Sequence, residues 1–198
     1  MSQALRTLYC STPATSACLS LAEAKSHLRV THIDDDDDIT DLALAAQQHV
    51  EDYLSRTLMP ATWVLSLSAF PAGKRPLMLD VAPYASLTSL AYTDGAGDGQ
   101  TLTETTDFKV SGNARPAFLF PVYGTTWPTA RREPDSVVVT WVAGYADAAS
   151  VPEVYKRAMR LLIGHWYENR EQVVVGTIAS ELPVGVRTLL RPHRDVRV

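Results

Sequence analysis

Five consecutive aspartates come nearest, by type and spacing, to a site that could do chemistry in this chain; they are Asp34, Asp35, Asp36, Asp37 and Asp38. Carboxylate oxygens suit Ca²⁺, but an EF-hand loop starting at Asp34 needs glycine at its sixth position and glutamate at its twelfth. The chain has Ile39 and Ala45 there, so the motif fails. We interpret the run as the solvated start of a helix, where carboxylates face the positive end of the helix dipole. In a ring of copies, the same run would form an acidic collar.

Other reactive residue types also lack the partners that catalysis needs. His165 and Glu168 are three residues apart on an expected helix, but there is no HExxH pattern and no cysteine nearby, so packing explains them better than metal binding. The glycines between Asp94 and Gly99 have the wrong spacing for a dinucleotide-binding loop and are typical of a hairpin turn. No serine lies in a G-x-S-x-G elbow. We therefore expect neither an enzyme nor a cofactor.

Composition limits the remaining classes of protein. The chain has 198 residues, of which 46% are hydrophobic, so it can bury a real core as one domain or two small ones. Its net charge of −4 argues against general attraction to nucleic acid. No apolar run is long enough for a signal peptide or a membrane span, so we expect assembly in a cytoplasm. Cys10 and Cys18 could form a bridge, but reduced thiols are the simpler interpretation.

Two helices are expected first, followed by a change to strand periodicity. Ser20 and Glu23 form a capping-box pattern, and a second amphipathic helix is expected over residues 37–56. Alternation of apolar and polar residues then predicts short strands, with turns between them. These strands are expected near residues 63–69, 77–79, 87–92, 102, 108–110, 118–120 and 136–142.

A long helix is expected after the last strand, with Ser150 as its N-cap, Pro152 in its first turn and Glu153 completing a capping box. It is apolar on two adjacent sides, so it needs more than one packing partner. The side chains that we assign to its core or to a subunit interface are Tyr155, Met159, Leu162, His165, Trp166, Glu168 and Arg170. A short final helix over 183–190 precedes a basic end.

The order of these elements predicts an α+β fold, a small antiparallel helical bundle with an all-β insertion between its second and third helices. The expected parts are an N-terminal arm (1–18), a helical core (19–60 and 144–190), a β-rich insert (61–143) and a C-terminal tail (191–198).

Three segments carry a resemblance to a known family. They are LSLAEAKSHLRV (19–30); YGTTWP (123–128) with VTWVAGY (139–145); and HWYENR (165–170), with Leu182-Pro183 and LLRP (189–192) behind it. In order and spacing they resemble the head–tail connector, or adaptor, proteins of tailed double-stranded-DNA phages and gene-transfer particles, in the version with a β-rich insertion. The likeness spans roughly residues 19 to 194.

The resemblance implies a structural virion protein located in the neck, at the head–tail interface. Copies would form a ring, expected to be a dodecamer, that docks on the portal protein and extends the DNA channel. The ring would also provide a platform for a stopper or tail-side neck protein, and genomic DNA would pass through without sequence-specific binding. The alternatives are a stopper or tail-completion protein, or a metal-dependent β-module. The family's C-terminal segment engages the portal, which points to Arg187, Arg191, His193, Arg194 and Arg197 here. A solvated end explains the same residues without a partner.

Overall fold

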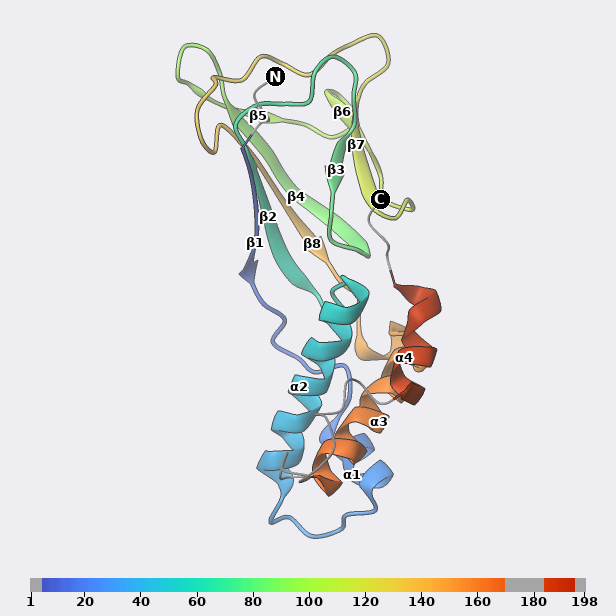
Figure 1. Cartoon of the computed structure of the whole chain (residues 1–198). Coiled ribbons are helices and arrows are strands. Elements are labelled where there is room, and N and C mark those ends of the chain that lie inside the picture. The colour runs from blue at the N-terminus through green and yellow to red at the C-terminus, as the bar shows by residue number, and fades with distance from the viewer. Residues whose placement is uncertain (1–4, 170–183, 195–198) are drawn as a thin grey trace, which may run out of the picture. The chain divides into compact units, whose positions relative to one another are not determined.

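The computed structural model describes residues 5–169 and 184–194 and confirms an α+β protein with antiparallel sheets (Figure 1). The chain divides into two compact units. Residues 1–14 and 60–145 form what we call the β unit, and residues 15–59 and 146–198 form the helical unit. The β unit therefore takes in a segment from the start of the chain as well as the segment between the second and third helices.

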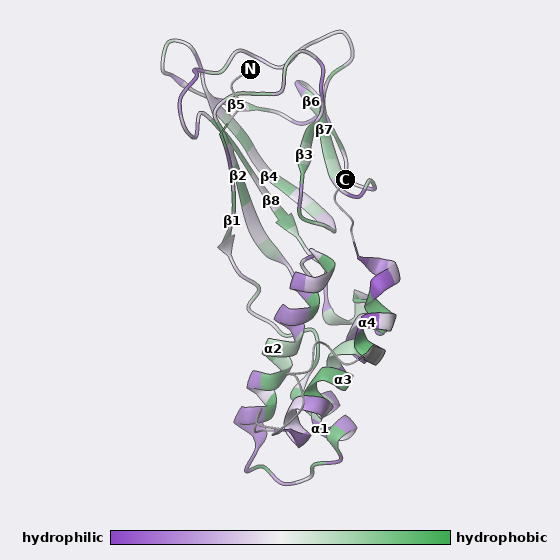
Figure 2. Ribbon diagram, in the orientation of Figure 1, coloured by the Kyte–Doolittle hydropathy of each residue, from purple (hydrophilic) through white to green (hydrophobic). Residues whose placement is uncertain are grey.

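The helical unit is built from four α-helices among the described residues: α1 (Leu21–Leu28), α2 (Asp36–Leu54), α3 (Glu153–Glu168) and α4 (Val184–Leu190). Two 3₁₀ turns, η1 (Ala148–Ser150) and η2 (Arg191–His193), flank α3 and α4. Apolar residues at helical spacing line one face of α2, which is buried at Ile39, Ala43, Ala46, Val50 and Leu54. Because two of these five residues are alanines, neighbouring helices can approach α2 closely. Figure 2 shows the apolar and polar stripes along these helices.

The helix starts follow the sequence at α1 and depart from it at α3. At α1 the capping box is confirmed: Glu23 N donates to Ser20 Oγ, and Ser20 N donates to the Glu23 carboxylate at 2.9 Å. The predicted cap at Ser150 is wrong, because Pro152 is the N-cap of α3. Ser150 instead ends η1, where its backbone N–H donates to Asp147 Oδ1 at 2.7 Å. Asp147 thus accepts the Ser150 N–H that Glu153 would accept in the predicted capping box, and a 3₁₀ turn precedes the helix.

The β unit contains two antiparallel sheets. The five-stranded sheet has the order β1-β2-β8-β4-β5, and the three-stranded sheet has the order β3-β7-β6. The strands are β1 (Arg6–Thr12), β2 (Ala61–Leu67), β3 (Leu77–Leu79), β4 (Tyr84–Thr93), β5 (Gly99–Leu102), β6 (Phe108–Ser111), β7 (Ala117–Pro121) and β8 (Val137–Ala143). The predicted strands from residue 61 onward are all present, with shifted ends.

The core of the β unit lies between the two sheets. Trp141 and Leu65 from the larger sheet and Phe108 and Leu119 from the smaller one are fully buried in one cluster. Trp127, from the segment between β7 and β8, stacks on Phe70 with ring centroids 5.1 Å apart and donates its indole N–H to Arg75 O at 2.8 Å. The two sheets therefore pack face to face, as in a sandwich.

The sheet face directed away from this core is uncharged. Alternation places Val137, Val139 and Trp141 inward, so the intervening side chains and their cross-strand partners point outward. The outward set is Thr7, Tyr9, Thr62, Val64, Ser66, Ser86, Ser89, Ala91, Thr101, Val138, Thr140 and Val142. No acidic or basic side chain occurs among these strand positions.

Strand β1 lies inside the segment expected to be an arm. It pairs with β2 in antiparallel register, with Leu8 opposite Leu65. Leu8 packs against the core, and the Arg6 guanidinium contacts Asp80 and donates to Met78 O at 3.1 Å. The segment's serines and threonines suit an exposed edge strand as well as a coil, so composition did not distinguish the two.

Candidate assembly surfaces

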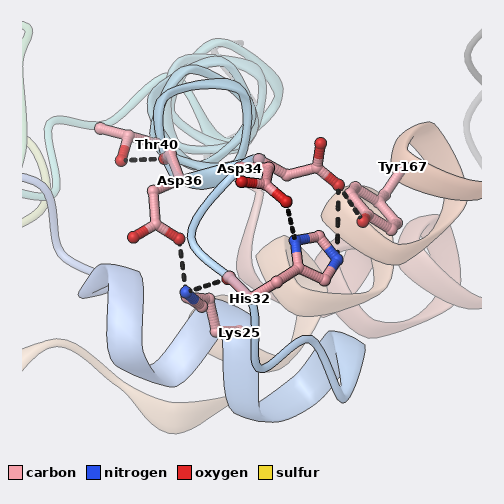
Figure 3. Close-up of polar contacts among 7 residues, drawn as sticks. Lys25, His32, Asp34, Asp36, Thr40 and Tyr167 are labelled. Carbon is pink, nitrogen blue, oxygen red and sulfur yellow. Dashed lines mark hydrogen bonds and ion pairs between the residues drawn. The ribbon is translucent and has the colours of Figure 1, made fainter.

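The aspartate run lies where α1 and α3 meet the start of α2 (Figure 3). The Lys25 ammonium contacts Asp36 and donates to His32 O at 2.6 Å. The His32 ring nitrogens lie 3.9 Å from Asp34 Oδ2 and 4.0 Å from Asp35 Oδ2. Through these contacts, the carboxylates of Asp34, Asp35 and Asp36 hold the turn between α1 and α2.

Asp35 also connects this turn to the end of α3, because the Tyr167 hydroxyl donates to Asp35 Oδ2. Asp35 occupies the N-cap position of α2 without making a side-chain cap bond, so its carboxylate serves tertiary contacts instead. Asp34, Asp37 and Asp38 are exposed, whereas Asp35 and Asp36 are half-buried. Among the described residues, no three His, Cys, Asp or Glu side chains are grouped so that they could hold a metal ion.

The residues singled out on α3 fall into two groups. Tyr155, Met159 and Leu162 are buried in the interior of the helical unit. His165 and Trp166 are half-buried, and Glu168 is exposed. Arg170 lies outside the described residues. The helix therefore provides core along its first three turns and a partly open surface at its end.

Trp166 packs within the helical unit, where it meets the edge of His49 on α2 with ring centroids 6.0 Å apart. Beside it, the Asn169 amide donates to His165 O at 2.8 Å and closes the end of α3. The aromatic residues that the sequence analysis stressed thus join α3 to α2 and to the Asp34–Asp38 turn, and Trp166 keeps part of its surface open.

The basic C-terminal residues do not all project into solvent. His193 meets Tyr155 edge to face with centroids 5.5 Å apart, and the Arg194 guanidinium lies 5.5 Å from the centroid of the Tyr53 ring. A cation–π contact of this kind contributes roughly 0.5–1 kcal/mol at an exposed site. Arg187 and Arg191 are exposed, and Arg197 lies outside the described residues. Part of the predicted portal-binding tail is thus packed on the helical unit.

Two polar side chains, buried Arg56 and half-buried Glu51, play roles that the sequence analysis missed. Arg56, the last residue of the helix expected over 37–56, is 8% exposed and donates from Nη1 to the Tyr155 hydroxyl at 3.2 Å. Glu51 accepts from Leu58 N at 2.7 Å and holds the chain as it leaves α2. Burial raises the pKa of Glu51, although the hydrogen bonds that its carboxylate accepts from Leu58, Gln47 and Met59 act in the opposite direction. The only signal in the sequence was their position near the helix end, just before Pro60.

The two cysteines lie in different units and neither is disulfide-bonded. Cys10 is exposed on β1, whereas Cys18 is buried against Met159, with the sulfur atoms 3.3 Å apart. Burial raises the pKa of the Cys18 thiol to about 12. Cys18 is thus a packing residue of the helical unit, and Cys10 is the thiol that solvent reaches.

The described residues thus form two compact units, with a charged helix turn, an exposed basic helix end and uncharged outward strand positions on the five-stranded sheet. None of the helices that the structure describes is both long and apolar enough to cross a membrane. Comparison with known proteins shows which proteins this chain is similar to.

A family model described as phage gp6-like head–tail connector protein matches residues 19–109. The fold is similar to a chain in the neck of an empty gene transfer agent (GTA) particle, computed with C6 symmetry, at a TM-score of 0.77 and 24% identity. A chain in the virion of a native GTA particle matches with a TM-score of 0.75 and 24% identity. A chain in the neck of a native GTA particle, computed with C12 symmetry, matches with a TM-score of 0.72 and 25% identity. Each match covers 97% of both chains.

No curated protein matches the sequence. The resemblance to head–tail connector proteins is nevertheless confirmed, by the family model over residues 19–109 and by the fold over 97% of the chain.

Proposed function

We propose that this protein is a structural component of a virion neck, where identical copies form a ring. The observation that carries the proposal is the fold match over 97% of both chains to neck proteins from particles solved with C6 and C12 symmetry. A ring of twelve copies fits the C12 symmetry of that relative. Heterologous contacts that close on themselves generate such rings.

In this proposal the helical unit is the connector core and the strands between α2 and α3 are its β-rich insert. The ring docks on the portal protein, extends the DNA channel and supports the next neck component. The exposed arginines at the end of the described chain, Arg187 and Arg191, are suited to an acidic or carbonyl-rich partner surface. Because His193 and Arg194 pack on tyrosines of the helical unit, the docking surface is best assigned to Arg187, Arg191 and residues beyond 194.

Mixing the protein with purified portal from the same virus, in the absence of tail proteins, tests this proposal. We expect a complex in which electron microscopy shows twelve copies in a ring. A variant with Arg191→Ser and without residues 195–198 is expected to dock at least tenfold more weakly, about 1.4 kcal/mol. It keeps the contacts of His193 and Arg194, so its thermal melting should not change.

Arg132→Ser serves as the matched control, because it removes one exposed positive charge from the β unit. It should dock like the wild type. If the wild-type protein ignores the portal but binds a purified tail-side neck protein, the portal-docking assignment is wrong and a stopper or tail-completion role takes its place.

A further inference from the structure

The two outward sheet faces of the β unit differ in character. On the five-stranded sheet, the outward strand positions are all uncharged. Tyr9 and Thr101 are exposed, Val138, Thr140 and Val142 are half-buried, and Val64 and Ser66 are buried. In a chain in which 20% of residues are charged, a partly exposed sheet face with no charged side chain at its strand positions is unusual. The nearest carboxylate is at the edge of the face, where Asp135 lines a hollow with Ala91, Thr101 and Val138.

The three-stranded sheet shows aromatic residues on its outward face. Leu119 of β7 is buried in the core, so its neighbours Phe118 and Phe120 point the opposite way. Their rings lie 6.1 Å apart, and Phe120 is 40% exposed. Met78 of β3 is paired with Phe118 and extends this face, and Lys109 of β6 is paired with Phe120 at its other side. The face therefore has protruding aromatic rings and no acidic residue among these described positions.

Together these two faces could bury apolar surface at little electrostatic cost. Removing a charged side chain from water is expensive unless it is paired, whereas Val, Thr and Phe side chains carry no such penalty. Lys109 is exposed on β6, at the edge of its sheet, where its ammonium group can stay in water. The rings of Phe118 and Phe120 suit the flat surface formed by the Val and Thr side chains of β8, away from Tyr9 on edge strand β1. The β unit as a whole has seven acidic and seven basic residues, so two β units do not repel each other through net charge, although each whole chain carries −4.

We propose that the outward face of the five-stranded sheet in one copy packs against the outward face of the three-stranded sheet in the next copy. The inference rests on the proposed ring, and it identifies which surfaces the β units use within it. Since the two faces differ, the contact is heterologous, and its repetition can close a ring rather than stop at a dimer.

The size of the faces indicates how strong one such contact is. Three strands about 4.8 Å apart, with four or five residues rising about 3.4 Å each, cover roughly 200 Å². A standard stable interface buries about 800 Å² on each partner. A single contact between two free copies is therefore weak and transient, and it becomes stable only when the ring closes or a platform holds the copies side by side.

Disulfide trapping detects such a transient contact without requiring a stable ring. Both chains carry Cys10→Ser. The first also carries Thr140→Cys on the five-stranded face, and the second carries Phe120→Cys on the three-stranded face. A tag makes the second chain longer. The two are mixed under mild oxidation and separated by mass. We expect the mixed disulfide to exceed each of the two homodimers more than tenfold, whereas random collision gives only about a twofold excess.

Thr106→Cys is the matched control, because Thr106 is exposed on a loop of the same unit and belongs to neither face. It should form disulfides with either partner only at the collision level. The proposal is overturned if the mixed disulfide does not exceed this control, or if the Thr140→Cys homodimer predominates. Should wild-type copies still form rings on the portal after such a result, only the assignment of these faces fails and the proposed function stands.

Discussion

At the scale of single residues, the tip of the β4–β5 hairpin shows how one carboxylate can organise a turn. Asp94 Oδ1 accepts the backbone N–H groups of Ala96, Gly97 and Asp98 at 2.9–3.1 Å, and Oδ2 accepts from the Gln100 amide. The hydrogen bond from Gln100 and those from the backbone lower the pKa of Asp94 below its usual value of 3.8. The glycines allow the turn, and Asp94 selects one conformation of it.

Replacing Asp94 with alanine should therefore loosen the hairpin tip. We expect faster hydrogen exchange at the amides of residues 96–98, with little change in the strands. Asp94→Asn keeps a side-chain oxygen that can accept the same bonds and should exchange much more slowly than the alanine variant. Because the pKa of Asp94 is lowered in the folded state, its contribution is present above about pH 4 and is lost as the pH falls through the folded value. Equal exchange in both variants would show that the glycines alone form the turn.

The two thiols should differ sharply in reactivity. Cys10 is exposed, whereas Cys18 is buried with its pKa raised to about 12, so at neutral pH almost none of Cys18 is thiolate. A thiol reagent such as Ellman's should titrate one group per folded chain and two after denaturation. In Cys10→Ser, the folded chain should show no fast reaction. Fast modification of Cys18 in that variant would contradict the burial seen in the structure.

Local patterns in the sequence predicted residues that act on their own neighbours and missed those that act at a distance. Ser20 and Glu23 are three residues apart, and their capping box was recognisable without any tertiary information. The predicted capping box at Ser150 is wrong because Asp147, three residues earlier, accepts the Ser150 backbone N–H that Glu153 was expected to accept. The bond between Arg56 and Tyr155 joins residues 99 positions apart, and no local pattern encodes it.

At the scale of elements, α2 and α3 are held together by buried apolar stripes, and leucines outside these stripes are exposed. Leu162 on α3 is 1% exposed, whereas Leu44 on the outer side of α2 is 48% exposed. Leu162→Ala removes buried methyl groups and leaves a cavity, so it should lower the free energy of unfolding by roughly 2–5 kcal/mol. Leu44→Ala is the matched control and should change it by less than about 0.5 kcal/mol.

Urea unfolding followed by far-ultraviolet circular dichroism measures both variants. Since the chain divides into two compact units, the transition assigned to the helices should shift alone. In a Trp166→Phe background, the fluorescence of the tryptophans of the β unit should then stay in place. A similar loss in both variants would mean that Leu44 is covered in the free protein.

Strand periodicity was strong enough to predict the elements between residues 61 and 143, because inward residues such as Val137, Val139 and Trp141 alternate strictly with outward ones. The first strand escaped because only Leu8 of β1 packs against the core, so alternation is not visible there. The pairing of β1 with β2 joins residues fifty or more positions apart, which a local pattern does not reveal.

At the scale of the whole molecule, charge is divided unevenly between the two units. The β unit has seven acidic and seven basic residues, and the helical unit has fifteen acidic and eleven basic residues. The net charge of −4 therefore comes entirely from the helical unit, and the Asp34–Asp38 run supplies more than its whole excess. Lysine and arginine contacts to phosphates dominate affinity for DNA, so an acidic excess keeps a protein from retaining it.

This distribution predicts that the wild-type protein does not bind double-stranded DNA even at low salt, as suits a proposed channel through which DNA must pass. Replacing all five aspartates with asparagine changes the net charge from −4 to +1, and this variant should show weak binding that disappears at about 200 mM salt. Fluorescence anisotropy with a labelled duplex measures both proteins, and circular dichroism checks that the variant keeps its helices without the contact between Lys25 and Asp36. Salt-sensitive binding by the wild type would show that its basic residues act as a local DNA-binding surface, and the acidic run would then not control passage.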